Sequence, residues 1–510
     1  MSSLNQFLIP IVAILSIVFF VRLIFKALFL IWLFQLKEYR FDRLFVHFRE
    51  TREGRRFFWT RRELVLWLVF ATPFFYRFPY VVDIYLILVV LVFGYEAKAF
   101  IEEVRKKQLR RPIFTKKAIL LTILTLLTVF YLSVPFSSIT LMFVDRLLIL
   151  IVALFVFVLG IVTNVAKTVL IVLAKRKLLQ VKNLIVIGVT GSYGKSMTKD
   201  LIADFLSEKY NVLKTPGSVN TDLGIALFVL RNHKQDHEVF VVEIGAYKRG
   251  EIAAVCEMVR PTIGLLTGIN EQHLSLFGSL ENTKKAKFEL IDSLPNDGMR
   301  LFNGDDPILL QTIKTSQVLR TQPARSTFGY SVKQLPVGIK AKNHPFLSNV
   351  AAAYLLAQKL GITSKALIAK VEKAVKSLGI KTQKIGDVIL LEDTFNTNPN
   401  GFTAALDILA TYKGKKIVVT PGIIELGSQS DRIHRELGEK IGKICDVAVL
   451  TNDNFEQPIR EGLKKTDFDM KHLLIPKREE LIPTIKNQVQ GRTVLLFEGR
   501  VPKELLITNY

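Results

Sequence analysis

The sequence of 510 residues predicts an α-helical membrane module followed by two α/β domains. Three observations lead to this fold class: long apolar runs in the first third, alternating strand-like and helix-like segments after it, and a glycine-rich phosphate-binding loop (P-loop) directly after the first strand of that series. We expect a transmembrane module at 1–180, a doubly wound central P-loop domain at 181–380 and a C-terminal Rossmann-like domain at 381–510.

The membrane module is predicted from apolar runs that are long enough, or nearly long enough, to cross a bilayer. They lie at 7–35, 63–76, 80–95, 118–136 and 147–166. The loops 37–62 and 98–117 carry nine and eight basic residues, whereas the alternate loops carry almost none. Because basic loops remain on the cytoplasmic side, the N-terminus is expected outside and everything after the fifth helix in the cytoplasm. This predicts a multi-pass protein of the cytoplasmic (inner) membrane.

The charge balance supports the same interpretation. Of the formal net charge of +24, residues 1–180 supply the larger part, with 25 Lys and Arg against 10 Asp and Glu. Basic residues beside apolar spans are typical of membrane topology, so we expect no nucleic-acid partner. Cys256 and Cys445 stand far apart, which argues against a disulfide framework or a cysteine zinc site. The helices either only anchor the chain or also bind a lipid-linked substrate or membrane partner.

Alternating β and α segments follow the membrane module. Strands are expected at 184–189, 239–243, 262–267, 299–303, 388–392, 416–420, 446–450 and 493–497, with helices between them such as 196–208, 349–360 and 365–377. This order is typical of doubly wound parallel sheets, which bind ligands at the carboxyl ends of their strands. A break near 378–384 suggests the boundary between the two domains.

The P-loop has the sequence TGSYGKS, Thr190–Ser196. Gly191 and Gly194 let backbone N–H groups, that of Ser192 among them, close around phosphates. Lys195 neutralises phosphate charge, and the hydroxyl of Ser196 is a ligand suited to Mg²⁺. The loop therefore predicts a nucleoside triphosphate site.

Further chemical groups stand at the ends of expected strands. They are Glu243, His273, the pair Asp305 and Asp306, and Asp393. An acid at a strand end is often only a helix cap, and a lone histidine is more often structural. Their repeated occurrence downstream of a P-loop favours a metal–nucleotide site instead.

These motifs together resemble the Mur ligase family, the ATP-dependent amide-forming enzymes of peptidoglycan precursor synthesis, over residues 181–500. The resemblance implies ATP and two magnesium ions, with Ser196, Glu243, His273 and Lys287 at the metals. It implies a carbamylated Lys287, whose added carboxylate bridges to a metal, and it makes Lys195, Lys287 and His273 catalytic. Asn349 falls where the family has an asparagine near the nucleotide base.

Two later motifs are most similar to the F-type members, which add D-alanyl-D-alanine to a UDP-muramoyl tripeptide. They are DTFNTNP, Asp393–Pro399, and IELGSQSDRIHRELG, Ile424–Gly438. The resemblance implies that Asp393 contacts the ribose and that Asn220, Asn396 and Asn398 lie near substrate.

The sequence also departs from the family pattern. The membrane module stands where the family has its N-terminal UDP-sugar-binding domain. Phe395 and Thr397 replace a tyrosine and an alanine, and FEGR, Phe497–Arg500, stands where a lysine-glycine-serine is expected.

The implied activity is a membrane-bound, ATP-dependent amide ligase of cell-wall precursor synthesis. A carboxylate attacks the γ-phosphate of ATP to give an acyl phosphate, and the amine of an amino acid or of a dipeptide such as D-Ala-D-Ala then displaces phosphate. The expected partner is a cell-envelope precursor, and loss of the UDP domain points to a lipid-linked form of it. Two alternatives remain open: the same chemistry in another surface-polymer or amidation pathway, and a catalytically weakened nucleotide-binding scaffold.

Overall fold

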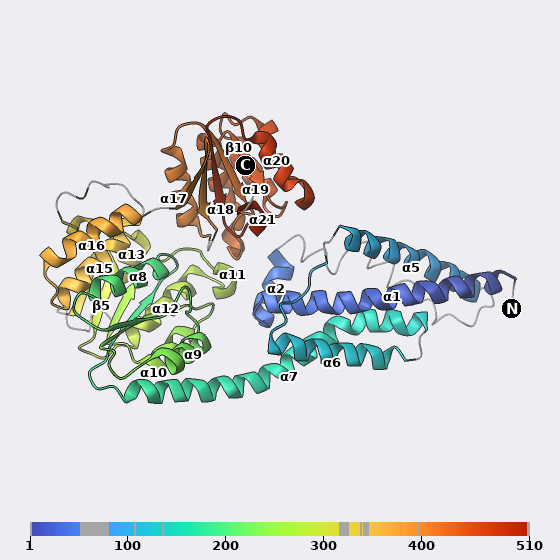
Figure 1. Cartoon of the computed structure of the whole chain (residues 1–510), viewed down its shortest axis with the longest axis horizontal. Coiled ribbons are helices and arrows are strands. Elements are labelled where there is room, and N and C mark those ends of the chain that lie inside the picture. Colours follow the sequence, from blue (N-terminus) through green and yellow to red (C-terminus); the bar gives the residue numbers. More distant parts are fainter. Residues whose placement is uncertain are drawn as a thin grey trace. The chain divides into compact units, whose positions relative to one another are not determined.

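The computed structural model describes residues 3–50, 81–106, 109–134, 137–315, 326–336, 339, 346–378, 380–394 and 397–506. The chain divides into two compact units, Met1–Ala166 and Lys167–Tyr510 (Figure 1). The first unit is helical, and the second contains two α/β domains.

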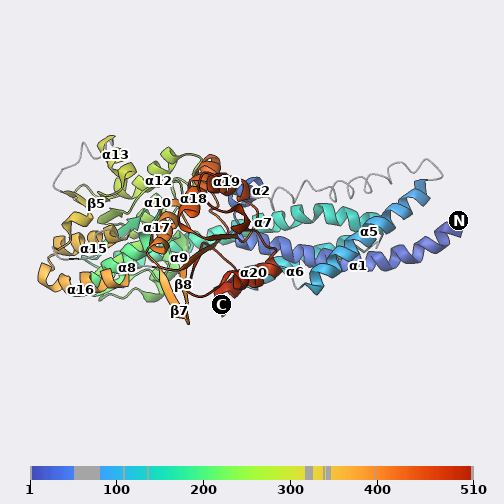
Figure 2. The ribbon, with the colours of Figure 1, turned by 90° about the horizontal axis from the view of Figure 1, so that it is seen from above.

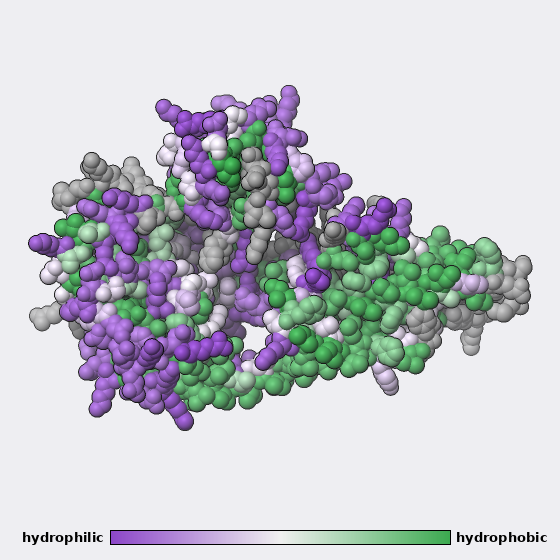
Figure 3. Space-filling model, viewed as in Figure 1, coloured by the Kyte–Doolittle hydropathy of each residue, from purple (hydrophilic) through white to green (hydrophobic). Residues whose placement is uncertain are grey.

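The helical unit is built from four mainly apolar helices and the short amphipathic helix α2. They are α1 (Ser3–Leu36), α2 (Phe41–Glu50), α5 (Val81–Arg105), α6 (Lys116–Leu132) and α7 (Ser138–Leu179). Within the described residues, three segments are long and apolar enough to cross a membrane: Phe7–Leu36, Ile84–Arg105 and Ser138–Leu179. Many of their large apolar side chains are exposed, and they cover the face of this unit seen in Figure 3.

Of the five expected spans, three correspond to long helices, one corresponds to a shorter helix, and one lies outside the described residues. The runs 7–35 and 147–166 lie in α1 and α7, and the described part of the run 80–95, residues 81–95, lies in α5. The run 118–136 corresponds to α6, whose 17 residues are fewer than the about 20 that a bilayer requires. The run 63–76 lies outside the described residues.

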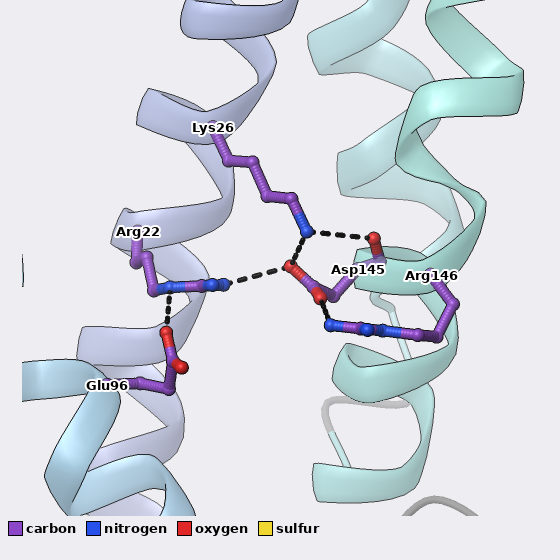
Figure 4. A network of polar contacts seen from close by, with 5 residues as sticks. All are labelled: Arg22, Lys26, Glu96, Asp145 and Arg146. Atoms are coloured by element: carbon purple, nitrogen blue, oxygen red, sulfur yellow. Dashed lines mark hydrogen bonds and ion pairs between the residues drawn. The ribbon is translucent and has the colours of Figure 1, made fainter. Parts of the chain in front are cut away.

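A network of buried charges joins three helices of this unit (Figure 4). Arg22 of α1 lies 2.6 Å from Glu96 of α5 and 2.9 Å from Asp145 of α7. Lys26 of α1 lies 2.7 Å from Asp145, which also pairs with Arg146. Because an unpaired charge in apolar surroundings is costly, these pairs fix the register of the three helices against one another.

The last turns of α7 pack within the second unit. Ala174 and Leu178 belong to a core of the α/β region, and Lys175 lies 2.8 Å from Glu257. The domain boundary expected at 180 therefore falls one residue after a helix that runs without interruption from Ser138.

The first α/β domain contains a parallel sheet. Its six described strands have the order β2-β3-β1-β4-β5-β6. The bounds are β1 Ile185–Thr190, β2 Val212–Lys214, β3 Val239–Glu243, β4 Ile263–Leu266, β5 Met299–Asn303 and β6 Thr327–Tyr330.

Helices cover both faces of this sheet (Figures 1 and 2). Helices α8 (Lys195–Leu206), α15 (Leu347–Lys359) and α16 (Ser364–Ser377) pack on one core, and α9 (Asp222–Asn232), α10 (Glu251–Val259) and α12 (Leu280–Asp292) pack on the other. Alternate residues of β3 supply the two cores, Val239 and Val241 to one and Phe240 and Val242 to the other. The remaining helices are α11 (Leu274–Phe277), α13 (Pro307–Thr315) and the 3₁₀ turn η3 (Val332–Gln334).

The second α/β domain has a mixed sheet whose six described strands have the order β11-β10-β9-β12-β8-β7. The bounds are β7 Lys381–Ile385, β8 Val388–Asp393, β9 Lys415–Thr420, β10 Val447–Leu450, β11 Leu473–Leu474 and β12 Thr493–Glu498. Its strands run parallel except for β7, which pairs antiparallel with β8. Helices α17 (Pro399–Ala410), α18 (Ser430–Ile444) and α19 (Glu456–Leu463) cover one face, and α20 (Leu481–Gln488) and α21 (Lys503–Leu506) the other. Three 3₁₀ turns complete it: η4 (Gly427–Gln429), η5 (Met470–His472) and η6 (Arg478–Glu480).

Every strand expected from the sequence is present within two residues of its predicted bounds. The sequence missed β2, β6, β7 and β11, which lie at or near sheet edges and lack a long apolar run. Strand β7 begins inside the segment 378–384, where the boundary between the two domains was expected. Its sequence KTQKI is polar and largely exposed, as charged edge strands often are.

We expect Asp145→Asn to destabilise the helical unit, because it leaves Arg22, Lys26 and Arg146 beside one another without their shared carboxylate. Breaking a buried pair in this way costs about 3 kcal/mol or more of unfolding free energy. Denaturation in detergent, followed by the fluorescence of the three tryptophans Trp32, Trp59 and Trp67, measures the loss. Asp42→Asn, at an exposed pair with Arg40, is the matched control and should change stability by less than about 1 kcal/mol. Equal stability of the two variants would contradict a role for the network in holding the helices.

Candidate active site

The P-loop joins β1 to α8, and its two glycines are required by close contacts. Gly194 has a φ of 76° at the N-terminus of α8, and a Cβ there would lie 2.8 Å from Oδ1 of Asn349. A Cβ at Gly191, whose φ is 152°, would overlap the side chain of Thr267. Asn349, at the start of α15, also accepts a hydrogen bond from Thr198 of α8 at 3.1 Å. The loop is thus held against α15 and the end of β4.

Lys195 folds back over the loop. Its Nζ donates hydrogen bonds to the carbonyl oxygens of Gly191 at 2.8 Å and Ser192 at 3.3 Å. Burial lowers the pKa of Lys195, and the nearby charge of Glu243 partly offsets this. The loop therefore carries a cation directed at its own concave side.

Glu243 is the last residue of β3, next to Val189 of β1, and its side chain is buried. Nδ2 of Asn220 donates to one carboxylate oxygen at 2.9 Å, and Nζ of Lys199 lies 3.5 Å from the other. Lys199 is itself fully buried and bonds to the carbonyl of Gly217. The carboxylate is held from two sides, and Asn220, expected near substrate, lies against it.

Lys287 is buried on α12, with its Nζ 5.6 Å from the ring centroid of Phe277. Burial lowers the pKa of Lys287 to about 7, and the charge of Lys195 contributes to this shift. A substantial fraction of its amine is therefore unprotonated at neutral pH.

His273 is the N-cap of α11, with a φ of 61°, and lies beside a carboxylate of the second α/β domain. Its Nδ1 is 2.5 Å from Oε2 of Glu425, and the ring of Tyr247 packs edge-on at 4.8 Å. Burial lowers the pKa of His273, although Glu425 acts in the opposite direction. The charges of Lys195 and Lys287 also lower it, so the three groups are close enough to influence one another.

The two α/β domains meet at a second polar contact. Nδ2 of Asn270 donates to Oδ1 of Asn398 at 3.1 Å and of Asn400 at 2.7 Å. Asn398 also caps α17 by accepting from the backbone N–H of Gly401 at 3.0 Å. Nearby, Arg432 lies 3.2 Å from Glu271. These contacts bring the start of α17 to the mouth of the P-loop.

One cavity of about 610 Å³ opens between these groups, a volume in the range of sites for nucleotide-sized ligands. It is lined by Ser192, Tyr193, Gly194, Lys195, Ser196, Met197, Glu243, Gln272, Asn303, Asp305, Phe346, Ser348, Asn349, Asp393, Asn398, Pro399, Asn400, Gly401, Thr403, Ala404 and Asp407. Most of the site residues expected from the sequence are in this lining. Gly191, Asn220, His273 and Lys287 lie outside it, and Asn396 lies outside the described residues.

Several residues of this region were not found from the sequence. Lys199 was missed because a lysine on a helix normally faces water. Tyr193 of the P-loop donates to Asp306 at 2.5 Å, a pairing across more than a hundred residues that leaves no local signal. Glu425 lay inside a recognised motif, but only the fold places it on His273.

Comparison with known protein families identifies the family of the two α/β domains. Residues 189–351 match the Mur ligase middle domain, and residues 378–501 match the Mur ligase glutamate ligase domain. The chain belongs to the Mur ligase family. The two matches together cover more than half of the chain, and they confirm the family that the sequence motifs indicated.

Two relatives of similar sequence are ligases of the same name. The chain is 30% identical over 277 residues to the UDP-N-acetylmuramoyl-tripeptide–D-alanyl-D-alanine ligase of Escherichia coli K12, covering 50% of this chain and 61% of that one. It is 28% identical over 335 residues to the ligase of the same name from Bacillus subtilis, covering 62% and 72%. The chain thus spans about three fifths of the length of the first of these Mur ligases.

Solved structures agree with the fold. MurF from Acinetobacter baumannii superposes with a TM-score of 0.56 at 24% identity, covering 66% of this chain and 78% of that one. The MurF ligase from Thermotoga maritima in complex with ADP superposes with a TM-score of 0.53 at 25% identity, covering 66% and 80%. Neither family match reaches the helical unit, which is unlike the UDP-binding domain of Mur ligases.

His434, the histidine of the Ile424–Gly438 motif, has a structural role. His434 is fully buried on α18, stacked on Phe455 with ring centroids 4.0 Å apart. Its Nδ1 donates to the carbonyl of Ser430 at 2.7 Å, and its Nε2 accepts from the backbone N–H of Ile423 at 3.0 Å. This arrangement requires a neutral imidazole and anchors the segment that carries Glu425.

We therefore expect the second α/β domain to lose stability in mild acid. Burial lowers the pKa of His434 from 6.5 to about 4, so the unfolded chain takes up a proton that the folded domain resists. The contribution of His434 to the free energy of unfolding is fully present above pH 6.5. It falls by about 3 kcal/mol as the pH drops to 4. Hydrogen exchange at the backbone amides of β9 measures this loss of stability, once the rates are corrected for the pH dependence of exchange in an unfolded chain. His434→Gln should remove this component, whereas His472→Gln, at an exposed site, should keep it; an unchanged profile in His434→Gln would refute the assignment.

Proposed function

We propose that the chain is a membrane-bound, ATP-dependent ligase that joins a carboxylate of a cell-envelope precursor to the amine of an amino acid or dipeptide. One observation carries this proposal: the P-loop residues Lys195 and Ser196, with Glu243, line the same cavity as Asp393 and Asn398 of the second α/β domain. The names of the relatives support the reaction class.

The P-loop side of the cavity fits the phosphates of ATP. Lys195 already lies over the loop with hydrogen bonds that phosphate oxygens would replace. Ser196 and Glu243 would hold Mg²⁺, which prefers hydroxyl and carboxylate oxygens and neutralises phosphate charge when bound. Lys199 and Asn220 fix the orientation of the Glu243 carboxylate, which supports this assignment. Asn349, beneath Gly194, suits the base, and Asp393 suits the ribose.

Lys287 has the chemistry that carbamylation requires. Its amine, partly unprotonated at neutral pH, attacks the carbon of CO₂ and loses a proton, leaving a carbamate on Nζ. The product is an anion close to Lys195 and His273, where it would hold the second magnesium ion together with His273. The bond from His273 Nδ1 to Glu425 fixes the imidazole and leaves Nε2 for that role.

The groups of the cavity can perform the two steps of an amide ligation. Lys195 stabilises the charge that develops as the substrate carboxylate attacks the γ-phosphate of ATP and ADP leaves. The amine then attacks the acyl phosphate carbonyl, phosphate leaves, and an amide remains. The contacts of Asn270 with Asn398 and Asn400 hold the second domain over the site, where it excludes water and presents the amine.

The apolar helices support a place in the cytoplasmic membrane. Phe7–Leu36, Ile84–Arg105 and Ser138–Leu179 each exceed the length of a bilayer crossing. The basic loops favour a cytoplasmic ligase region, where ATP is available. Because this unit stands where Mur ligases have a UDP-binding domain, we propose a lipid-linked form of the precursor.

Lys195→Ala should abolish ATP-dependent amide formation, because it removes the only cation in the P-loop. The loss expected is at least a hundredfold, as for a group that stabilises transition-state charge. Membranes containing the full chain are supplied with ATP, lipid-linked or UDP-linked stem peptides and amine donors, and products are identified by mass spectrometry.

Lys182→Ala, at an exposed lysine before β1, is the matched control and should retain activity. Absence of any amide product from the unaltered chain, with every carboxylate and amine pair, would overturn the ligase proposal. Cellular function that survives Lys195→Ala but is lost on deletion of the helical unit, residues 1–166, would favour a scaffold instead.

A further inference from the structure

The last turns of α7 lie beside α9 (Figure 1) and contact it at both of its ends. At the first residue of α9, Nζ of Lys167 lies 2.5 Å from Oδ2 of Asp222. In the last turn of α9, Nζ of Lys177 donates hydrogen bonds to the carbonyl oxygens of Val229 at 3.2 Å and Leu230 at 2.8 Å. An acid at the start of a helix and a cation at its end both agree with the helix dipole. The end of α7 therefore fixes both ends of α9.

The carboxylate of Asp222 joins Lys167 to the backbone of α9. Its other oxygen accepts a hydrogen bond from the backbone N–H of Leu223 at 2.7 Å. Just before it, Thr221 caps the helix by accepting from the backbone N–H of Gly224 at 3.3 Å. The ion pair and the cap together determine where the first turn of α9 lies.

Asn220 stands two residues before Asp222 and reaches the candidate metal site. Its Nδ2 donates to Oε1 of Glu243 at 2.9 Å, and its carbonyl oxygen accepts from the backbone N–H of Gly245 at 2.9 Å. A Cβ at Gly245 would lie 2.8 Å from Cγ of Asn220, so the two segments pack closely. A shift of the first turn of α9 would therefore move the amide that holds Glu243.

The carboxylate of Glu243 needs both of its partners to keep one orientation. Asn220 holds one oxygen, and Nζ of Lys199 lies 3.5 Å from the other. Glu243 lines the cavity, whereas Asn220 and Lys167 lie outside its lining. If the amide moved away, the attraction of Lys199 would act alone and turn the carboxylate from the P-loop. Groups that orient a metal ligand in this way strongly affect metal affinity.

We propose that Lys167 is a positioning residue for the metal site. Its ion pair with Asp222 holds the first turn of α9, and through Asn220 it holds the carboxylate of Glu243 in the orientation that binds Mg²⁺. This inference rests on the proposed function, in which Glu243 is a magnesium ligand. It adds that α7 contributes to the metal affinity of the ligase region.

The position of Lys167 in the chain gives this role a functional meaning. Lys167 is the first charged residue after the apolar run 147–166, in a helix that is continuous from Ser138. It also precedes both segments that match the Mur ligase family, 189–351 and 378–501. The helix that this chain carries in addition to the family domains therefore orients a ligand of the family site.

A second ion pair of α7 provides the reference for an ordinary surface contact. Lys175 lies 2.8 Å from Glu257, which joins α7 to α10 and not to α9. The side chain of Glu257 is 79% exposed, whereas that of Asp222 is 25% exposed. Because exposed pairs contribute little, we expect the two lysines to differ in their effect on the metal site.

The test measures metal binding directly, with the full chain in detergent micelles saturated with ADP. Mn²⁺ takes the place of Mg²⁺, and electron paramagnetic resonance measures the free ion. Lys167→Met keeps the length of the side chain and removes its charge. We expect it to weaken Mn²⁺ binding about tenfold, as for loss of a group that orients a metal ligand. The affinity for ADP without divalent metal, measured by calorimetry, should stay within about twofold, because the P-loop is unaltered.

Three further variants test the route. Lys167→Arg restores the charge and should restore Mn²⁺ binding to within about twofold. Lys175→Met removes the reference pair and should leave Mn²⁺ binding unchanged. Lys167→Met combined with Asn220→Ala should bind Mn²⁺ no more weakly than Asn220→Ala alone, because both changes act through one hydrogen bond.

Mn²⁺ binding that is unchanged by Lys167→Met, or that is weakened equally by Lys175→Met, overturns the inference. Additive losses in the double variant also overturn it, since Lys167 would then act without Asn220. Loss of metal-free ADP binding in Lys167→Met overturns it as well, by assigning the ion pair to the stability of the domain. Weaker Mn²⁺ binding by Lys167→Met, with no amide product from the unaltered chain, would refute the proposed function alone. Amide formation by a chain whose Mn²⁺ affinity does not depend on Lys167 would refute the positioning role alone.

Discussion

The contact between Asn270 and the first turn of α17 determines what this ligase region can do. Each of the two sheets directs the carboxyl ends of its parallel strands to one edge, but an edge by itself supplies only part of the groups lining the cavity. The bonds from Asn270 to Asn398 and Asn400, together with the pair of His273 and Glu425, bring the two edges into one enclosure. Lys195 from one sheet and Asp393 from the other face the same space as a result.

Local patterns were enough to predict the framework of the fold. The P-loop, the central strands and the polar residues at their ends follow from short stretches of sequence, and the structure places nearly all of these elements where they were expected. What the sequence did not reveal are the partners: Lys199 beside Glu243, Glu425 beside His273, and Glu498 beside Asp393. Each pairing joins residues that are separated by dozens to more than a hundred positions, so only the packed chain specifies it. Strand β7 was missed for a different reason, because an exposed edge strand needs no apolar run.

Buried charge is compensated within the chain in both units. In the helical unit, Asp145 is surrounded by Arg22, Lys26 and Arg146. In the first α/β domain, the buried carboxylate of Glu243 accepts a hydrogen bond from Asn220 and lies 3.5 Å from Nζ of the fully buried Lys199. The cost of desolvation therefore fixes the register of helices in one place and the orientation of a site carboxylate in the other.

The hydrogen bonds from Lys195 to the carbonyls of Gly191 and Ser192 have a consequence for how nucleotide is recognised. They keep the loop ordered before any anion enters, so the conformational entropy of the loop is lost during folding and not during association. When a polyphosphate enters, the ammonium of Lys195 exchanges its hydrogen bonds to backbone carbonyls for stronger ones to phosphate oxygens. The backbone of the loop needs little rearrangement for this. Discrimination among nucleotides at this loop should accordingly follow the number and charge of their phosphates, and association should be fast, since no slow ordering step precedes it.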